Sequence, residues 1–273
     1  MTAPLSALVL TAGLGTRLDP LTQVRAKPAV PVAGEPLIRR IVTWLVANGI
    51  TDVTCNLHHL PHTLTAVLGD GRDLGASVRY SWEQPHVLGS AGGPRQALGI
   101  VGTDPLLIVN GDTLTDVPLD RLRAAHEERG ASVTLALTPN HAPDRYGGVR
   151  LHSDGRVSGF VRRGASAEGS FHFVGVQIAA AGVFADIPQG HAASTIGGVY
   201  DALIASRPGA VRGLVVDAAF HDIGSVTDYL RTSHALAQGR PIVGRHFSCA
   251  PSAQVTRSIV WDDVSIGEHA VVD

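Results

Sequence analysis

Two glycines and two cations follow a short apolar run near the start of the chain, and together they can bind a polyphosphate. The run Ala7–Leu10 is long enough for a buried strand. Gly13 and Gly15 have no Cβ, so their backbone N–H groups can approach phosphate oxygens closely. Arg17 adds a forked guanidinium and Lys27 a mobile ammonium. The segment predicts a site for a nucleoside triphosphate, although an ordinary strand-to-helix turn would explain the glycines alone.

The spacing of these glycines differs from that of two common phosphate loops. The dinucleotide-binding fingerprint needs a third glycine, and Leu18 stands at that position. The Gly-Lys-Ser/Thr of the P-loop does not occur in the chain. The predicted triphosphate site is therefore of another kind.

Two aspartates are candidates for a metal site. Asp112 comes after Leu106–Val109, an apolar run where a carboxylate is costly to bury unless it meets a cation. Asp222 lies in a His-Asp-Ile-Gly motif late in the chain. Mg²⁺ usually takes one or two carboxylates together with substrate phosphates, so the pair predicts a Mg²⁺ site. For either acid alone, a helix cap or a surface turn is the alternative.

The whole string from Gly13 to Pro28 resembles the signature of the sugar-1-phosphate nucleotidyltransferases, Gly-x-Gly-Thr-Arg-Leu-x-Pro-x-Thr followed by Lys-Pro. The resemblance is closest to the mannose-1-phosphate guanylyltransferases and covers nearly the whole chain. It implies transfer of a nucleoside monophosphate from an NTP to a sugar 1-phosphate, with release of pyrophosphate. It also implies catalytic roles for Arg17, Lys27 and Asp112, and Mg²⁺ held by Asp112 and Asp222.

The segment from Glu83 to Gly93 resembles a second signature of this family, Glu followed by Leu-Gly-Thr-Ala-Gly, and the resemblance implies contact with the base. Its Leu-Gly-Ser-Ala-Gly form favours guanylyl transfer, so GTP with mannose 1-phosphate or a related sugar is the preferred pair, and uridylyl or thymidylyl transfer is the alternative. The residues that the resemblance assigns to the nucleotide are Leu10, Ala12, Gly13, Gly15, Thr16, Arg17, Gly89 and Ser90.

The acceptor side departs from the family pattern. The resemblance assigns sugar contacts to Asn110, to Gly147 in a Tyr-Gly-Gly-Val segment, and to Arg162. Where the family commonly has Glu-Lys-Pro, this chain has Arg162 and Arg163, so an arginine can replace the lysine as phosphate clamp but the sugar-binding carboxylate is missing there. A solvated turn is the alternative for the two arginines. The departure also leaves room for a non-catalytic relative that senses a nucleotide sugar.

Strand and helix patterns alternate through the first half, with a helix expected over Pro36–Asn48 and another over Gly92–Val101. The strands read as apolar runs, which predicts an α/β fold: a Rossmann-like mixed, mostly parallel sheet with helices on both faces. From Gly147 the segments alternate as antiparallel strands do, and a helix is expected within Thr195–Ser206. We expect a catalytic domain over residues 1–240, with a nucleotide half at about 1–140 and a sugar half at about 141–240.

The last residues follow a different period. Val260, Ile266 and Val272 recur every six residues, which predicts that residues 241–273 start a left-handed hexapeptide β-helix. Two visible periods are too few for an independent core, so the segment is either truncated or a stub that docks elsewhere. A β-hairpin is the alternative.

Composition narrows the class of protein. With 273 residues, 44% of them hydrophobic, the chain can bury a large core, and a net charge of −2 gives no general attraction to nucleic acid or to an anionic membrane. Small-molecule substrates are therefore expected, a homo-oligomer being left open. Cys55 and Cys249 have no metal or disulfide spacing, and the chain shows no leader or long apolar span, so a cytoplasmic location is expected. His58, His59 and His62 lack acidic partners at ligand spacing, which favours a loop or helix-start role over a metal site.

Overall fold

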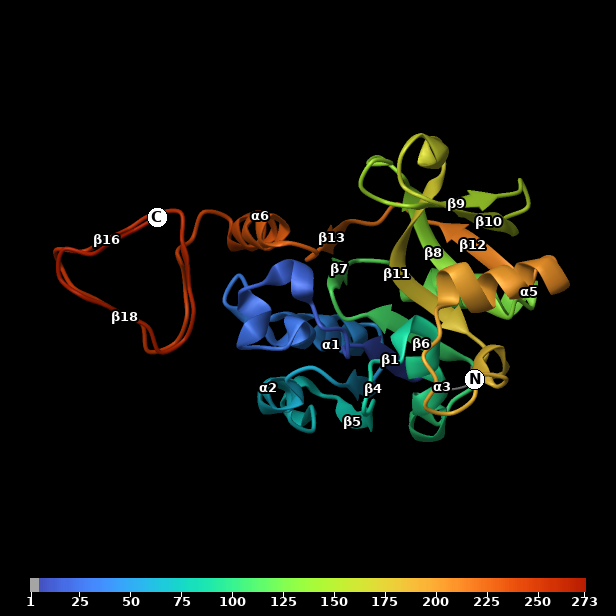
Figure 1. Ribbon diagram of the computed structural model, residues 1–273, viewed down its shortest axis with the longest axis horizontal. Helices are drawn as coiled ribbons and strands as arrows, with labels where there is room; N and C mark the ends of the chain where they lie inside the picture. Colours follow the sequence, from blue (N-terminus) through green and yellow to red (C-terminus); the bar gives the residue numbers. More distant parts are fainter. Residues whose placement is uncertain (1–4) are drawn as a thin grey trace.

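The computed structural model describes residues 5–273, and its centre is a nine-stranded sheet flanked by helices (Figure 1). The strands of this sheet are β1 (Ala7–Leu10), β4 (Asp52–Leu57), β5 (Ser77–Trp82), β6 (Leu106–Asn110), β8 (Val133–Pro139), β9 (Gly148–Leu151), β10 (Val157–Val161), β11 (Phe171–Ala179) and β12 (Val211–Val215). The helices are α1 (Leu37–Ala47), α2 (Pro61–Leu68), α3 (Gly89–Val101), α4 (Leu119–Arg129), α5 (Tyr200–Ser206) and α6 (Val226–Ala237). Two short pairs complete this part: β2 (Pro31–Val32) with β3 (Glu35–Pro36), and β7 (Thr113–Thr115) with β13 (Phe220–Asp222).

The sheet changes character along its width. Its strand order is β10-β9-β11-β6-β1-β4-β5, and β8 pairs with both β11 and β12. The neighbours β6, β1, β4 and β5 are all parallel, whereas β11 runs antiparallel to β6, β8 and β9. The carboxyl ends of β1 and β6 therefore meet at one edge, which is where parallel sheets bind ligands. The predicted mixed, mostly parallel α/β fold is confirmed.

Buried side chains lie on both faces of the sheet because successive strand residues point in opposite directions. Ala7 and Val9 of β1 belong to one core cluster, which includes residues of α1, α2 and α4. Leu8 belongs to the other, which includes residues of α3 and α5. This arrangement explains why the strands read as apolar runs and not as alternating patterns.

Two predicted helices have different bounds in the structure. Helix α3 begins at Gly89, three residues before the expected Gly92, because Gly89 and Ser90 already form its first turn. Within Thr195–Ser206 only α5 is a regular helix. The segment before it is broken, since Ile196, Gly197 and Gly198 have non-helical backbone angles.

The C-terminal residues wind into coils that project from the rest of the molecule (Figure 1). Their strands are β14 (Ile242–Val243), β15 (Ser248–Cys249), β16 (Gln254–Val255), β17 (Ile259–Val260), β18 (Ser265–Ile266) and β19 (Val271–Val272). The first coil contains β14, β15 and β16, and the second contains β17, β18 and β19. Each strand of the first coil pairs in parallel with one strand of the second, as β14 does with β17. A hairpin would pair antiparallel, so the hairpin alternative is wrong and the start of a β-helix is confirmed. Across residues 5–273 no helix combines the length and the apolar character needed to cross a membrane.

Candidate active site

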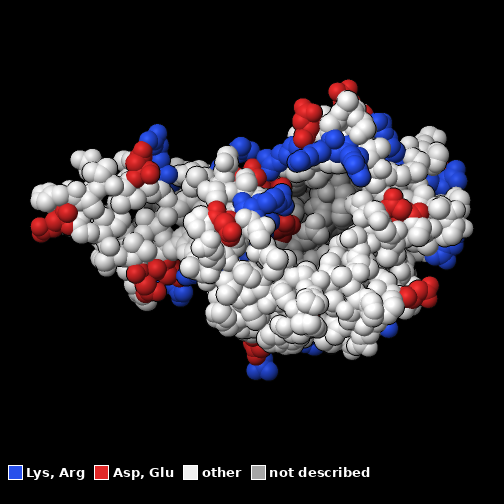
Figure 2. All heavy atoms as spheres, viewed as in Figure 1, with Lys and Arg blue, Asp and Glu red and all other residues white. Residues whose placement is uncertain are grey.

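A cavity of about 340 Å³ lies where β1 and β6 end, and Figure 2 shows the molecule hollowed, with positive side chains along the rim of the hollow. All eight residues predicted to bind the nucleotide line it, as do Lys27, Asn110 and Asp112. Its lining is Leu10, Thr11, Ala12, Gly13, Gly15, Thr16, Arg17, Lys27, Pro28, Asn56, Glu83, Val87, Gly89, Ser90, Asn110, Gly111 and Asp112. Residues far apart in the sequence thus line the same cavity.

The segment from Gly13 to Pro28, here called the phosphate loop for its predicted role, folds back on itself at Gly15. This residue has a φ of +68°, and a Cβ there would lie 2.9 Å from Thr22 Cγ2 and 3.0 Å from Lys27 Cβ. Only glycine fits such a close approach in this conformation without strain. Thr22 further donates its hydroxyl to Asp19 Oδ1 (2.6 Å). The loop therefore brings Lys27 back beside the glycines.

The two cationic side chains of the loop differ in their burial and in their ion pairing. Lys27 is buried, and its Nζ lies 2.7 Å from Asp112 Oδ2. Arg17 is exposed and, in the part of the chain that the structure describes, its guanidinium has neither a hydrogen-bond nor an ion-pair partner. An unpaired guanidinium at the mouth of a cavity is available to a phosphate.

The two predicted metal ligands are brought together by the β7–β13 pair. Asp222 pairs with Thr113, and Ile223 donates its backbone N–H to the carbonyl oxygen of Asp112 (3.0 Å). Burial raises the pKa of Asp222, and the charge of Asp112 raises it further, while nearby cations oppose both. Two adjacent, partly buried carboxylates supply the hard oxygen donors that a divalent cation prefers. No group of three potential metal-ligating side chains occurs among residues 5–273.

One buried carboxylate in the lining was not among the predicted site residues. Glu83 is fully buried, and its Oε1 accepts from Asn56 Nδ2 (2.6 Å) while Oε2 accepts from the backbone N–H of Leu88 (2.6 Å). Asn56 Oδ1 in turn accepts from the backbone of Thr11 (2.5 Å). Glu83 therefore connects Leu88, just before α3, to Asn56 of β4 and through it to Thr11 at the end of β1. Asn56, a polar residue near the end of the apolar strand β4, is the sequence signal that could have pointed to this connection.

Residues 193–195, in the predicted sugar half, contact the loop predicted to meet the base. Gly89 has a φ of +75°, and a Cβ there would stand 2.8 Å from the carbonyl oxygen of Ala193. The backbone N–H of Ala91 donates to the same oxygen (2.9 Å). Ser90 Oγ accepts from the backbone N–H of Thr195 (2.9 Å). The start of α3 is thus held from the opposite half of the domain.

The acceptor residues are only partly gathered. Asn110 lines the cavity, and its side chain packs where a Cβ on Gly175 would stand, 2.7 Å from Nδ2. Gly147 and Arg162 do not line that cavity. They lie close to each other. A Cβ on Gly147 would stand 2.9 Å from the carbonyl oxygen of Val161 and 3.8 Å from the backbone nitrogen of Arg163, the residues on either side of Arg162. The guanidinium of Arg162 is exposed and, in the described chain, has no partner.

The histidine cluster fastens loops. His58 Nδ1 donates to the carbonyl oxygen of Glu83 (2.8 Å), and His59 Nε2 donates to that of Thr22 (2.7 Å). Both histidines lie in the turn before α2, and His62 lies in its first turn. The contacts of His58 and His59 therefore connect the turn before α2 to Glu83 and to Thr22.

Fold and site together define a class. A glycine-rich, cation-bearing loop at the carboxyl edge of a mostly parallel sheet, next to two aspartates, is typical of a nucleotide-binding α/β protein.

Comparison with known proteins narrows this class. Residues 6–239 match the nucleotidyl transferase family, and the chain belongs to that family. The mannose-1-phosphate guanylyltransferase of Mycobacterium tuberculosis is 32% identical, over the whole of this chain and 84% of its own length. The D-glycero-alpha-D-manno-heptose 1-phosphate guanylyltransferase of Aneurinibacillus thermoaerophilus is 30% identical, over 85% of this chain and 98% of its own. The crystal structure of HddC from Yersinia pseudotuberculosis complexed with GMP-PN has a TM-score of 0.73 at 21% identity, covering 85% of this chain and 99% of its own, and so shows the same fold.

The family fixes the reaction. The protein is a sugar-1-phosphate nucleotidyltransferase of EC class 2.7.7, and its family generally uses a divalent metal. Membership therefore favours the predicted catalytic function over the non-catalytic alternative.

Proposed function

We propose that the protein transfers a guanylyl group from GTP to mannose 1-phosphate or a related sugar 1-phosphate. One observation carries this proposal: a single cavity is lined by the unpaired Arg17, by the Lys27–Asp112 pair and by Gly89 and Ser90 of the predicted base loop. Two of the relatives named above are guanylyltransferases for a manno-configured sugar phosphate, which supports the choice of base and sugar.

The mechanism needs no protein nucleophile. The acceptor phosphate is already an anion at neutral pH and attacks the α-phosphorus of the nucleotide in line, so the protein aligns the substrates and neutralises charge. Arg17 would stabilise charge on the α-phosphate and on the departing pyrophosphate. Lys27 would neutralise the attacking or transferred phosphate once substrate competes for its contact with Asp112.

Asp112 and Asp222 are the proposed Mg²⁺ ligands. Both are carboxylates, both are partly buried, and their backbones are joined by the Ile223 hydrogen bond, so the donor set fits a hard cation. When bound, Mg²⁺ would supply positive charge to phosphate oxygens of donor and acceptor.

The sugar phosphate is proposed to lie between the cavity and the loop that precedes β9. Asn110 and Gly147 would contact the sugar, and Arg162 would clamp its phosphate in two hydrogen bonds. This arrangement belongs to the proposed catalytic domain, residues 1–240, with residues 241–273 as the β-helix stub.

Uridylyl or thymidylyl transfer is the second candidate. The UTP–glucose-1-phosphate uridylyltransferase of Synechocystis is 28% identical over 82% of this chain and 61% of its own length. A scan of the four NTPs against hexose, heptose and amino-sugar 1-phosphates, read as pyrophosphate release in the presence of Mg²⁺, separates the candidates. The guanylyl proposal requires GTP with a manno-configured acceptor to give the highest kcat/KM, and a higher value for UTP or dTTP would overturn it.

A further inference from the structure

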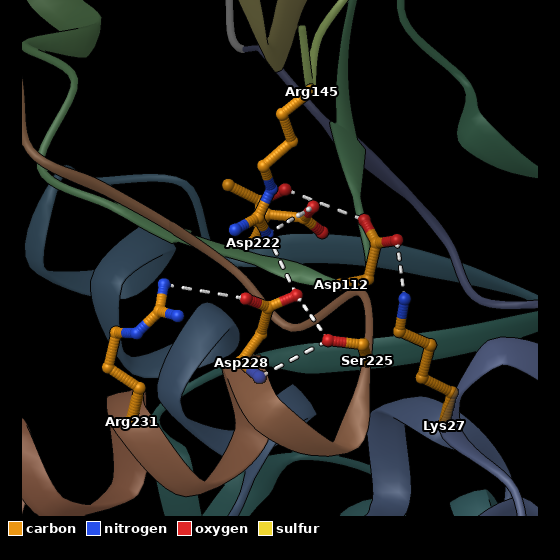
Figure 3. A network of polar contacts seen from close by, with 8 residues as sticks. Lys27, Asp112, Arg145, Asp222, Ser225, Asp228 and Arg231 are labelled. Atoms are coloured by element: carbon orange, nitrogen blue, oxygen red, sulfur yellow. Dashed lines mark hydrogen bonds and ion pairs between the residues drawn. The ribbon is translucent and has the colours of Figure 1, made fainter. Parts of the chain in front are cut away.

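Arg145 connects the loop that carries the acceptor residues to the proposed metal site. It lies in residues 140–147, here called the acceptor loop, between β8 and β9. Its Nη2 is 3.4 Å from Asp222 Oδ2 and 2.8 Å from Asp228 Oδ2 (Figure 3). One guanidinium therefore bridges a proposed metal ligand and a second carboxylate that the mechanism does not use.

Asp228 is a fixed anchor. It lies in the first turn of α6, its side chain is only 10% exposed, and its backbone N–H donates to Ser225 Oγ (3.3 Å). Ser225 Oγ also donates to Asp228 Oδ2 (2.7 Å). By contrast Arg231, 3.7 Å from Asp228 Oδ1, is 66% exposed and reaches no other carboxylate that the structure describes. The short contact of the bridge is therefore the one to the fixed carboxylate, and the long one is to Asp222.

The loop side of the bridge is also well held. The Arg145 guanidinium lies over the ring of Tyr146, 4.8 Å from its centroid. The Tyr146 ring contacts His172 and Phe220, at centroid distances of 4.3 and 5.7 Å. Phe220 belongs to β13, the strand that ends in Asp222. The acceptor loop is thus packed directly against the strand that carries Asp222, so a movement of one is transmitted to the other through these side chains.

Each proposed metal ligand has a cation of its own in this structure. Lys27 lies against Asp112 and Arg145 against Asp222, and Figure 3 shows the two cations approaching from opposite sides. A divalent cation that binds both carboxylates must compete with both side chains, because opposite charges within about 4 Å attract strongly and like charges repel. Lys27 can turn to substrate phosphate, whereas Arg145 already has a second carboxylate to hold it.

We propose that Arg145 is a positioning residue that couples the acceptor loop to the metal site: it neutralises Asp222 in the metal-free enzyme and is retained by Asp228 when a divalent cation takes Asp222. This inference rests on the proposed metal role of Asp222. The acceptor loop then stays anchored at Asp228 in both states, which keeps Gly147 in place for the sugar.

Two variants have opposite expected effects on metal binding, which structural damage alone would not produce. Arg145→Ala removes the competing cation, so Mn²⁺ should bind the substrate-free enzyme about three- to tenfold more tightly. Asp228→Asn removes the alternative anchor and leaves Arg145 to Asp222, so Mn²⁺ should bind more weakly by a similar factor. Arg231→Ala is the matched control, since Arg231 contacts Asp228 alone, and it should leave Mn²⁺ affinity within twofold of wild type.

The measurement is Mn²⁺ affinity without nucleotide or sugar, from the electron paramagnetic resonance signal of free Mn²⁺, followed by KM for the sugar 1-phosphate. Arg145→Ala should raise that KM more than it lowers kcat, because it releases the acceptor loop. Unchanged or weaker Mn²⁺ binding by Arg145→Ala, or tighter binding by Asp228→Asn, would overturn the proposal. Asp222→Asn separates the two levels: if it leaves Mn²⁺ affinity unchanged, the metal assignment itself is wrong, and if it abolishes binding while Arg145→Ala has no effect, only the role of Arg145 is wrong.

Discussion

Gly224 leaves space for the Asp222 carboxylate. A Cβ on Gly224 would stand 2.8 Å from Asp222 Oδ2 and 3.1 Å from Oδ1, both closer than side chains normally approach. The atoms it would meet belong to the end of a side chain, so a substitution moves Asp222 and not the backbone. Gly224 thus determines where the second proposed metal ligand can lie.

Gly224→Ala should therefore impair metal binding in a protein that still folds. We expect a Mn²⁺ affinity lowered about tenfold or more, and a fall in kcat at subsaturating metal, because Asp222 must rotate away from its present position. Gly99→Ala is the control, since Gly99 lies within α3 and a Cβ there meets nothing within 4 Å. Equal Mn²⁺ affinities for the two variants would contradict the assignment.

Arg17 offers a clean test of the triphosphate site. Its guanidinium has no partner among the residues that the structure describes, so Arg17→Ala should leave the melting temperature unchanged. Its kcat should fall by about 10²–10³, the loss typical of one preorganised transition-state donor. Arg72→Ala removes the same charge from a side chain that is 87% exposed and pairs with Asp70, and it should remain fully active. An Arg17→Ala variant with near-normal turnover would remove Arg17 from the catalytic residues.

The sequence pointed to the candidate site residues but not to the contacts between them. Arg17 and Asp112 could be predicted because their motifs are short and lie at strand ends, and the fold class could be predicted because apolar runs separated by helical patterns imply a parallel sheet. Asp222 was predicted as a partner of Asp112, yet the pairing of β7 with β13 that brings it there joins segments far apart in the chain. Contacts at such separation leave no local pattern.

The same limit explains what the prediction left out. The Glu83–Asn56 hydrogen bond and the contacts of Arg145 lie between different loops, and a single charged residue in a loop has the same pattern whether or not it is paired. Helix α4 was not predicted because its apolar face is narrow and most of its residues are charged or small. The break before α5 follows from Gly197 and Gly198, whose freedom of φ overrides the helical spacing around them.

His172 should make the protein less stable in acid. The pKa of His172 is lowered from 6.5 to about 4, chiefly by burial and also by the charge of Arg145, while a backbone hydrogen bond to Gly147 opposes the shift. Below pH 6.5 the unfolded chain takes up a proton that the folded chain refuses until about pH 4, so the free energy of unfolding falls as pH drops through this window and is fully retained above it. The loss attributable to this group is about 3 kcal/mol at most.

His172→Phe should remove that part of the pH dependence. Phenylalanine keeps a ring against Tyr146 and Phe220, and it has no proton to bind. Urea unfolding at a series of pH values should show a shallower decline for the variant between pH 6.5 and 4. His126 is buried and its pKa is lowered as well, so some acid sensitivity remains in both proteins. Parallel curves for wild type and variant would show that His172 does not contribute.

Trp261 connects the C-terminal coils to α6 and to the segment that contains Arg25. Its Nε1 donates to the hydroxyl of Tyr229 in α6 (2.8 Å), and the guanidinium of Arg25 lies 4.9 Å from its ring centroid. Trp261→Ala should lower the free energy of unfolding by about 1–3 kcal/mol and speed proteolysis within residues 238–260. Trp82→Ala, at an exposed position on β5, is the control. Unchanged proteolysis in the Trp261 variant would mean that other contacts hold the coils.

The hydrogen bonds from Ala91 to Ala193 and from Thr195 to Ser90 bear on how such enzymes can be redesigned. The predicted base loop, residues 83–93, is held by residues 193–195, here called the strap. In sequence the strap belongs to the half of the domain proposed to bind the sugar. A chimera that imports residues 83–93 alone from a uridylyl-specific relative would place its new loop against a strap shaped for the old one. With the proposed base role of this loop, base preference would depend on both segments, so a swap intended to change it must carry both.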